Sequence, residues 1–153
     1  MAAKTIKIAL GDINIDQRLR VRDIDAHKVA VFRDALSLKK NLGALLIDQE
    51  NVLVDGHHRY TALMKTFDPD YLVSAKQQEF ADEKSRLVAA GAVNQEHGFR
   101  LTPFEEKRLA FRLKTEGASE EEVSKAIGRP VSKIIRWHND AILLIGPDNK
   151  REP

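Results

Sequence analysis

Three cationic or titratable side chains, His57–Arg59, follow a glycine at the point where a strand is predicted to give way to a helix. The stretch Asn51–Val54 favours a strand, Asp55-Gly56 is a turn pair, and a helix is predicted from Tyr60 onward. A helix N-terminus carries unpaired backbone N–H groups and a partial positive charge, which favour acidic side chains there. The residues at this helix start have the opposite sign, and a bound anion would resolve the conflict.

Three interpretations of Gly56–Arg59, called the GHHR turn below, remain open. A metal site is disfavoured because adjacent side chains diverge on a helix, and the other three histidines lie far away in sequence. In a purely structural turn, one histidine would be buried and the other exposed, with Arg59 paired to an acid such as Asp55. In a phosphate site, backbone N–H groups and cationic side chains would converge on one anion. Histidine protonation would then strengthen anion binding as the pH falls through about 6.5.

A second pattern, in the C-terminal part of the chain, predicts a helix-turn-helix. Ser119 can cap a helix, and Glu122 stands three residues later as its capping-box partner. Gly128 supplies a tight turn and Pro130 suits the start of the next helix. The residues predicted to face inward are Val123, Ile127, Ile134 and Trp137, with Ser124 small where the helices cross.

The polar residues left on the outside of this predicted helix pair are of types that contact phosphates and base edges in the major groove. The alternative is an ordinary helical hairpin whose charged face is only solvated. The spacing is that of a DNA-binding helix-turn-helix, and we therefore predict DNA contact. The candidate residues are Lys125, Arg129, Ser132, Lys133, Arg136 and Asn139.

The preceding segments predict a mixed order of strands and helices. Strands are expected at residues 4–10 and 71–77, and two more within residues 44–56, on either side of the polar centre 48–51. Helices are expected at 25–38, with a stop at 41–43, and at 80–93. Arg18, Arg20 and Arg22 alternate, so an extended segment would be basic on one side. Thr102, Pro103 and Glu105 then predict a well-capped helix, followed only by helices. We place a domain boundary near residues 94–101.

Composition limits the classes of function. The 153-residue chain has no cysteine, which excludes disulfides, thiolate metal sites and thiol catalysis. It has no apolar run near the roughly 20 residues that span a bilayer, and its start lacks the apolar core of a signal peptide. A cytoplasmic location is expected. The net charge of +2 is too small to indicate a nucleic-acid partner by itself.

Two segments resemble the ParB/sulfiredoxin superfamily. "LVDGHHRYTAL" looks like its GERR-type phosphate box, and "AGAVNQEHGFRLTPFEEKRLAFRL" is similar to the segment joining a ParB-like domain to its helix-turn-helix. The resemblance covers about Ile6 to Ile145. It implies that the box grips the phosphates of a nucleotide, often cytidine triphosphate (CTP), with Mg²⁺. The residues that it assigns to nucleotide or phosphate binding are Gly56, His57, His58 and Arg59, with Arg22 upstream and Asn94 helping to hold Mg²⁺.

The chain also departs from this family's pattern. Val93 and His97 stand where ParB proteins usually have an acidic residue and an arginine, which weakens the case for triphosphate hydrolysis. His57 takes the place of the cysteine that sulfiredoxins need, which excludes that activity. No paired carboxylates near a plausible metal site support nuclease chemistry. Full ParB proteins continue into a separate dimerisation domain, and the resemblance does not extend to that domain.

The sequence thus predicts an α+β fold with a small mixed-sheet ParB-like domain at residues 1–98, a helix-turn-helix domain at 99–146 and a flexible tail at 147–153. The predicted function is DNA binding as a ParB-like partition or transcription-regulatory protein, with a nucleoside triphosphate as a candidate controlling ligand. One alternative is a nucleotide phosphohydrolase or nuclease centred on the GHHR turn; another is a turn that binds only DNA phosphate. Expected partners are double-stranded DNA and, at least on DNA, a second copy contacting Ile135, Ile142 and Leu143.

Overall fold

The computed structural model describes the backbone of residues 3–93 and 101–145, and the side chains as far as residue 139. The chain divides into two compact units, Met1–Arg86 and Leu87–Pro153, which are described separately. In the described ranges, none of the helices combines the length and the apolar character needed to cross a bilayer.

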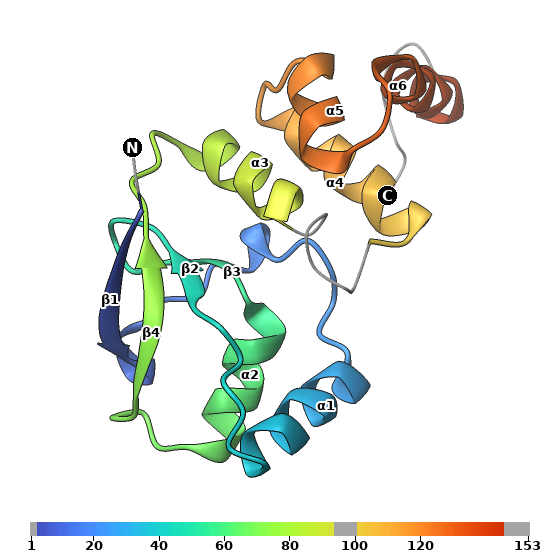
Figure 1. The fold of residues 1–153 in the computed structure, drawn as a ribbon. Helices are drawn as coiled ribbons and strands as arrows, with labels where there is room; N and C mark the ends of the chain where they lie inside the picture. The colour runs from blue at the N-terminus through green and yellow to red at the C-terminus, as the bar shows by residue number, and fades with distance from the viewer. Residues whose placement is uncertain (1–2, 94–100, 146–153) are drawn as a thin grey trace. The chain divides into compact units, whose positions relative to one another are not determined.

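The first unit is built on a four-stranded mixed sheet, as the sequence predicts, with strand order β1-β4-β2-β3 (Figure 1). The strands are β1 (Lys4–Ala9), β2 (Leu45–Ile47), β3 (Leu53–Asp55) and β4 (Leu72–Gln77). β1 pairs antiparallel with the whole of β4, from Lys4 opposite Gln77 to Ala9 opposite Leu72. β2 pairs parallel with β4 only from Leu45 opposite Ala75 onward, and β3 pairs antiparallel with β2.

Two helices of the first unit pack against each other, α1 (Ala26–Ser37) and α2 (His57–Thr66), and α2 lies beside the sheet (Figure 1). α1 begins where the sequence predicts, because the Asp25 carboxylate accepts the backbone N–H groups of His27 and Lys28. The core of the unit consists of buried apolar side chains from the strands, from α2 and from the 3₁₀ turn after β1: Ile8, Leu10, Ile13, Leu45, Ile47, Leu53, Leu63, Val73 and Ala75.

Two details of the first unit differ from the sequence-based expectation. α1 ends at Ser37 rather than near Gly43, because Lys39 already takes a left-handed backbone conformation with φ 60°. The three alternating arginines do not share one basic side. Gln17–Leu19 forms a 3₁₀ helix, so Arg18 is exposed and pairs with Asp16, whereas Arg22 is only 5% exposed.

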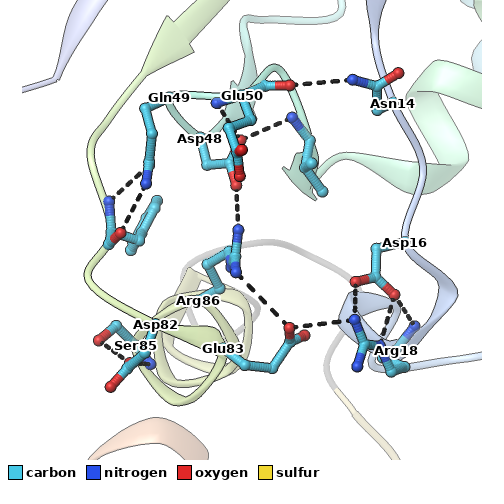
Figure 2. A network of polar contacts seen from close by, with 12 residues as sticks. Asn14, Asp16, Arg18, Asp48, Gln49, Glu50, Asp82, Glu83, Ser85 and Arg86 are labelled. Carbon is cyan, nitrogen blue, oxygen red and sulfur yellow. Dashed lines mark hydrogen bonds and ion pairs between the residues drawn. The ribbon is translucent and has the colours of Figure 1, made fainter.

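A fully buried carboxylate, that of Asp48, holds the β2–β3 connection (Figure 2). Its Oδ1 accepts the backbone N–H groups of Glu50 and Val52, both at 2.8 Å, and its Oδ2 accepts from Arg86 of α3 (Glu83–Val93). Arg86 also lies near Glu83, which reaches Arg18 at 3.5 Å. The network thereby ties three segments that are distant in sequence.

A neighbouring amide explains why α3 begins at Glu83 rather than at Phe80. The side chain of Gln49 donates to the carbonyl of Phe80 and accepts from its N–H group, both at 2.9 Å. These bonds hold the backbone of Phe80 out of the helix. Asp82 then starts the helix by accepting the N–H group of Ser85.

The second unit contains α4 (Pro103–Thr115), α5 (Glu120–Ile127) and α6 (Val131–Ile145). α4 and α5 each start with a capping box, Thr102 with Glu105 and Ser119 with Glu122, as the sequence predicts. The second half of α3 belongs to this unit, so the division falls before the predicted boundary at residues 94–101. The reason is close packing: a Cβ on Gly91 would lie 2.8 Å from the side chain of Leu109 of α4.

We expect Asp48→Asn to lower the free energy of unfolding of the first unit by about 3 kcal/mol, because it removes one partner of a buried ion pair. Urea denaturation followed by far-ultraviolet circular dichroism measures this change. Glu50→Gln, which removes an exposed carboxylate from the same connection, is the control and should change stability by less than about 0.5 kcal/mol. Equal stabilities for the two variants would show that the Asp48 network does not hold the unit together.

Candidate phosphate site and nucleic-acid interface

Gly56 joins β3 directly to α2 through a backbone conformation that favours glycine. Its φ is +105°, in the left-handed region. A Cβ at this position would lie 2.6 Å from Leu45 Cδ2 and 2.9 Å from Arg59 Nη2. The absence of a side chain therefore lets α2 begin immediately after the strand, with Arg59 folded back beneath the turn.

Arg59 is buried beneath the GHHR turn, with 8% of its surface exposed. Its Nη1 donates to the carbonyl of Ala44 at 3.0 Å and to that of Leu42 at 3.4 Å, and its Nη2 donates to the Asp55 carboxylate at 3.0 Å. The pairing with Asp55 confirms that part of the structural interpretation. Contact between Arg59 and an anion stays a prediction, because both terminal nitrogens already bind groups of the protein.

The first turn of α2 has the features of an anion-binding helix start. It contains no acidic residue, and Gly56 provides no side-chain cap. The first helical hydrogen bond runs from the N–H group of Tyr60 to the carbonyl of Gly56, at 2.8 Å. The N–H groups of His57–Arg59 precede that bond, so they are the donors that a phosphate at this end of the helix would use.

His57 is half-buried, and its Nε2 atom is buried with no hydrogen-bond partner among the described residues. Burial, followed by the positive charges of Arg20 and His58, lowers the pKa of His57 to about 4, against the opposing charge of Asp16. The imidazole is therefore neutral at pH 7. The sequence-based expectation of proton uptake near pH 6.5 is corrected for this residue: it titrates at lower pH unless an anion is bound.

His58 connects the GHHR turn to the start of α1. Its Nε2 accepts the backbone N–H group of Asp25 at 3.0 Å, which requires the Nε2 atom to carry no proton. Burial lowers the pKa of His58, and the charges of Lys28 and Arg22 lower it further. Neither histidine is fully exposed, so the expectation of one buried and one exposed imidazole is not met.

The charges that depress these pKa values identify the cations around the turn. Arg20 acts on His57, and Lys28 and Arg22 act on His58. The structure thus brings Arg22 near the GHHR turn. Arg20 and Lys28 were not among the sequence-based site residues, although Lys28 lies in the first turn of a helix whose cap contacts His58. Asn94, the residue implied to hold Mg²⁺, lies outside the described residues.

The helix-turn-helix of the second unit has the predicted interior. Ile134 and Val123 are fully buried, Ile127 is 3% exposed and Trp137 is 8% exposed. Gly128 ends α5 with φ +80°, and the Ser124 hydroxyl donates to the carbonyl of Arg129 across the turn. The turn is thereby fixed at both of its ends.

The six candidate DNA-binding residues do not form one exposed set. Lys125, Ser132, Arg136 and Asn139 are exposed. Lys133 is half-buried, with its Nζ 5.7 Å from the centre of the Trp137 ring. Ser132, Arg136 and Asn139 are spaced i, i+4 and i+7 along α6, so they lie on one exposed face of the helix.

Arg129 has a structural partner that is distant in sequence and that no local pattern indicates. Its Nε donates to both carboxylate oxygens of Glu106 of α4, at 3.1 and 3.2 Å, and Glu106 is only 4% exposed. This pair joins the turn between α5 and α6 to α4. Arg129 therefore holds the turn in place, and its predicted contact with DNA is not needed to explain its position.

The chain has close structural neighbours but matches no protein-family model and no curated protein. A Pnob8-like ParB N-domain matches 93% of this chain and 72% of its own, at 15% identity and a TM-score of 0.66. The fold is that of ParB N-terminal domains. This confirms the predicted α+β architecture.

Two further neighbours are structures of C-terminally truncated ParB, a chromosome-partitioning protein of Caulobacter crescentus. The structure complexed with CTP-gamma-S matches 95% of this chain and 81% of its own, at 14% identity and a TM-score of 0.54. The structure complexed to the centromeric parS site matches 94% of this chain and 73% of its own, at 14% identity and a TM-score of 0.57. At these identities the ParB likeness is one of fold.

We expect Gly56→Ala to destabilise the protein more than Gly117→Ala does. Both glycines have positive φ, +105° and +88°, so both variants carry the left-handed strain of about 1–2 kcal/mol. Only the Cβ at position 56 meets other atoms, whereas position 117 has nothing within 4 Å. Thermal melts of the two variants test this. Equal losses of stability would contradict the close packing around Gly56.

We expect the free energy of unfolding to fall as the pH is lowered from 6.5 towards 4. The pKa of His57 is lower in the folded chain, so the unfolded chain binds more protons in this window, and stability there rises with pH. His57→Gln should make the dependence shallower, and His27→Gln, on the exposed surface of α1, is the control. Urea titrations at several pH values measure the pH dependence of the free energy of unfolding for each variant. An unchanged pH dependence in His57→Gln would contradict the burial of a neutral imidazole.

Proposed function

We propose that this protein is a DNA-binding partition or transcription-regulatory factor that places the first turns of α6 in the major groove. The observation that carries the proposal is the polar face Ser132, Arg136 and Asn139 on the helix that follows the tight turn. Arginine and asparagine make the bidentate contacts to guanine and adenine that are commonest in specific recognition. The serine hydroxyl suits a phosphate or a base edge.

Rigidity of the supporting turn favours this interpretation over a solvated hairpin. Gly128 gives the turn its left-handed residue, and the pair of Arg129 with buried Glu106 fixes the turn to α4. A recognition helix must be held in one orientation for its side chains to discriminate bases. A helix whose outer face is only solvated does not need to be fixed in this way. The C. crescentus ParB structure in complex with the parS site adds support by likeness of fold.

A nucleoside triphosphate such as CTP is the proposed controlling ligand, at the GHHR turn. Its phosphates would meet the N–H groups of His57–Arg59, with Arg20, Arg22 and Lys28 supplying positive charge. The likeness to a ParB that is complexed with CTP-gamma-S supports the choice of ligand. Bound phosphate supplies the negative charge that the first turn of α2 lacks.

The hydrolytic alternatives have no comparable support. Among the described residues there is no group of three or more histidine, aspartate or glutamate side chains that could hold a metal ion. We therefore propose no cleavage chemistry. Comparing the affinities for CTP and for inorganic phosphate distinguishes a nucleotide site from a turn that binds only DNA phosphate. In the second case CTP would bind no better than inorganic phosphate.

Two copies are proposed to act together on DNA, because one helix-turn-helix reads only a short half-site. Ile135 is 44% exposed on α6 and is available for such a contact. The side chains of Ile142 and Leu143 lie outside the described residues, so their part in the dimer stays a prediction. Sedimentation on a saturated duplex should show two copies.

We expect the double variant Arg136→Ala with Asn139→Ala to lose sequence-specific DNA binding. Each lost base contact should cost about 1–3 kcal/mol. The wild-type protein is first used to select sites from duplexes of about 30 random base pairs, which is long enough for two half-sites about 10 base pairs apart. Affinities for the selected site are then compared by fluorescence anisotropy.

Arg33→Ala, which removes an exposed positive charge from α1, is the control and should bind the selected site almost as well as wild type. The double variant should retain the wild-type melting temperature, because both side chains are exposed. Selection that enriches no sequence, or a double variant that binds like wild type, would contradict the assignment of α6 as the recognition helix.

A further inference from the structure

The first unit contains a groove that the proposed DNA and nucleotide sites do not use. Its volume is about 590 Å³, within the range of about 300–1,000 Å³ typical of ligand pockets. It reaches α2 at Leu63 and Phe67, which belong to the end of that helix opposite the GHHR turn. The remaining lining comes from the end of α1, the connection before β2, the start of β2, the start of β4, and β1. These residues are Leu36, Ser37, residues 39–43, Leu45, residues 71–74 and Lys7.

The groove arises from incomplete pairing in the sheet. β4 pairs with β1 along its full length, from Leu72 to Gln77. On its other side, β2 pairs with β4 only from Ala75 onward. Among the described residues, Leu72–Ser74 therefore have no strand partner on the β2 side, and the segment of residues 39–43 forms the opposite wall of the groove.

The surface of the groove is apolar and polar in nearly equal parts. Leu36, Leu42 and Phe67 pack on the core beneath it. Phe67 stacks on Tyr71 with ring centroids 3.9 Å apart and an interplanar angle of 6°, which gives a flat aromatic wall. At the rim, Leu72 is 59% exposed and Tyr71 is 43% exposed. A small molecule inside the groove would leave these rim side chains in water.

The charge in the groove has one sign. Lys7, Lys39 and Lys40 line it, and none of the lining residues is acidic. The Nζ of Lys7 donates to the hydroxyl of Ser74 at 2.9 Å, which holds this lysine beside the part of β4 that does not pair with β2. Three cations that line a groove together with apolar side chains favour an occupant that carries both carboxylates and apolar side chains.

The wall opposite β4 is already formed. The N–H groups of Lys39 and Lys40 donate to carbonyls at the end of α1, at 2.9 and 3.0 Å. The N–H group of Gly43 donates to the Asn41 side chain at 2.8 Å. Arg59 donates to the carbonyl of Leu42. A partner would therefore meet a preorganised surface, which lowers the entropic cost of binding.

We propose that this groove binds an extended segment of a partner protein in which apolar and acidic side chains alternate. The segment lies beside Leu72–Ser74 and adds backbone hydrogen bonds to that edge of β4, as in other cases of strand addition. Its apolar side chains cover Leu42, Phe67 and Tyr71. Its carboxylates meet Lys7, Lys39 and Lys40.

The test uses two capped five-residue peptides, Val-Glu-Val-Glu-Val and its charge-reversed analogue Val-Lys-Val-Lys-Val, titrated into the ¹⁵N-labelled full chain. The acidic peptide should bind saturably and shift the backbone amide signals of Leu42, Gly43 and Leu72–Ser74. The basic peptide should not bind. Lys39→Glu with Lys40→Glu should weaken binding of the acidic peptide by roughly fivefold or more, since two exposed ion pairs become repulsive.

The matched control is Arg33→Glu with Lys65→Glu. It changes the net charge by the same amount as the Lys39→Glu, Lys40→Glu variant, but at exposed positions outside the groove lining. It should bind the acidic peptide within about twofold of wild type, as expected for screened charges away from the site. A further variant, Leu72→Glu, keeps both lysines and should also lose binding. The proposal is overturned if the acidic peptide does not saturate, if both double variants weaken it equally, or if the amide shifts centre on His57–Arg59.

Discussion

The left-handed backbone of Gly56 and the guanidinium of Arg59 together determine how α2 joins β3 in the first unit. Because Gly56 has no side chain, α2 starts directly on the end of β3 and Arg59 can fold back under the turn. Arg59 then binds Asp55 of the strand and the carbonyls of Leu42 and Ala44. A single buried side chain thus orients the N–H groups of the first turn of α2 and fixes one wall of the groove beside β4.

The commitment of Arg59 to the protein changes how the GHHR turn can attract an anion. The positive charge comes from Arg20, Arg22 and Lys28, whose influence is visible in the lowered pKa values of the two histidines. Both imidazoles are therefore neutral at pH 7 without a ligand. An anion placed among these groups would favour their protonated forms, so binding and proton uptake are coupled.

Local patterns in the sequence predict much of this fold, because local interactions determine those features. The capping boxes at Thr102 and Ser119 and the left-handed Gly128 are all found where residue type and spacing place them. The four strands follow their apolar runs. The buried side chains Val123 and Ile134 likewise follow the helical period of 3.6 residues.

The features that the sequence does not predict depend on contacts between distant residues. Glu106 and Arg129 are 23 positions apart, and their pairing gives Arg129 a role in supporting the turn, while its contact with DNA stays a prediction. The burial of Arg22 likewise depends on its tertiary surroundings. The groove exists because β2 pairs with only part of β4, a matter of register that apolar periodicity does not determine.

The most direct measurement for the central claim, that the N-terminus of α2 is an anion site, is an NMR titration of the ¹⁵N-labelled chain with CTP and Mg²⁺, with inorganic phosphate in parallel. The account predicts saturable shifts of the backbone amides of His57, His58 and Arg59, tighter binding of CTP than of phosphate, and a rise in the pKa of His57 above about 4. Lys28→Ala should weaken the binding without moving its location. Unchanged amide signals at these three residues under saturating CTP, or shifts confined to another part of the chain, would contradict it.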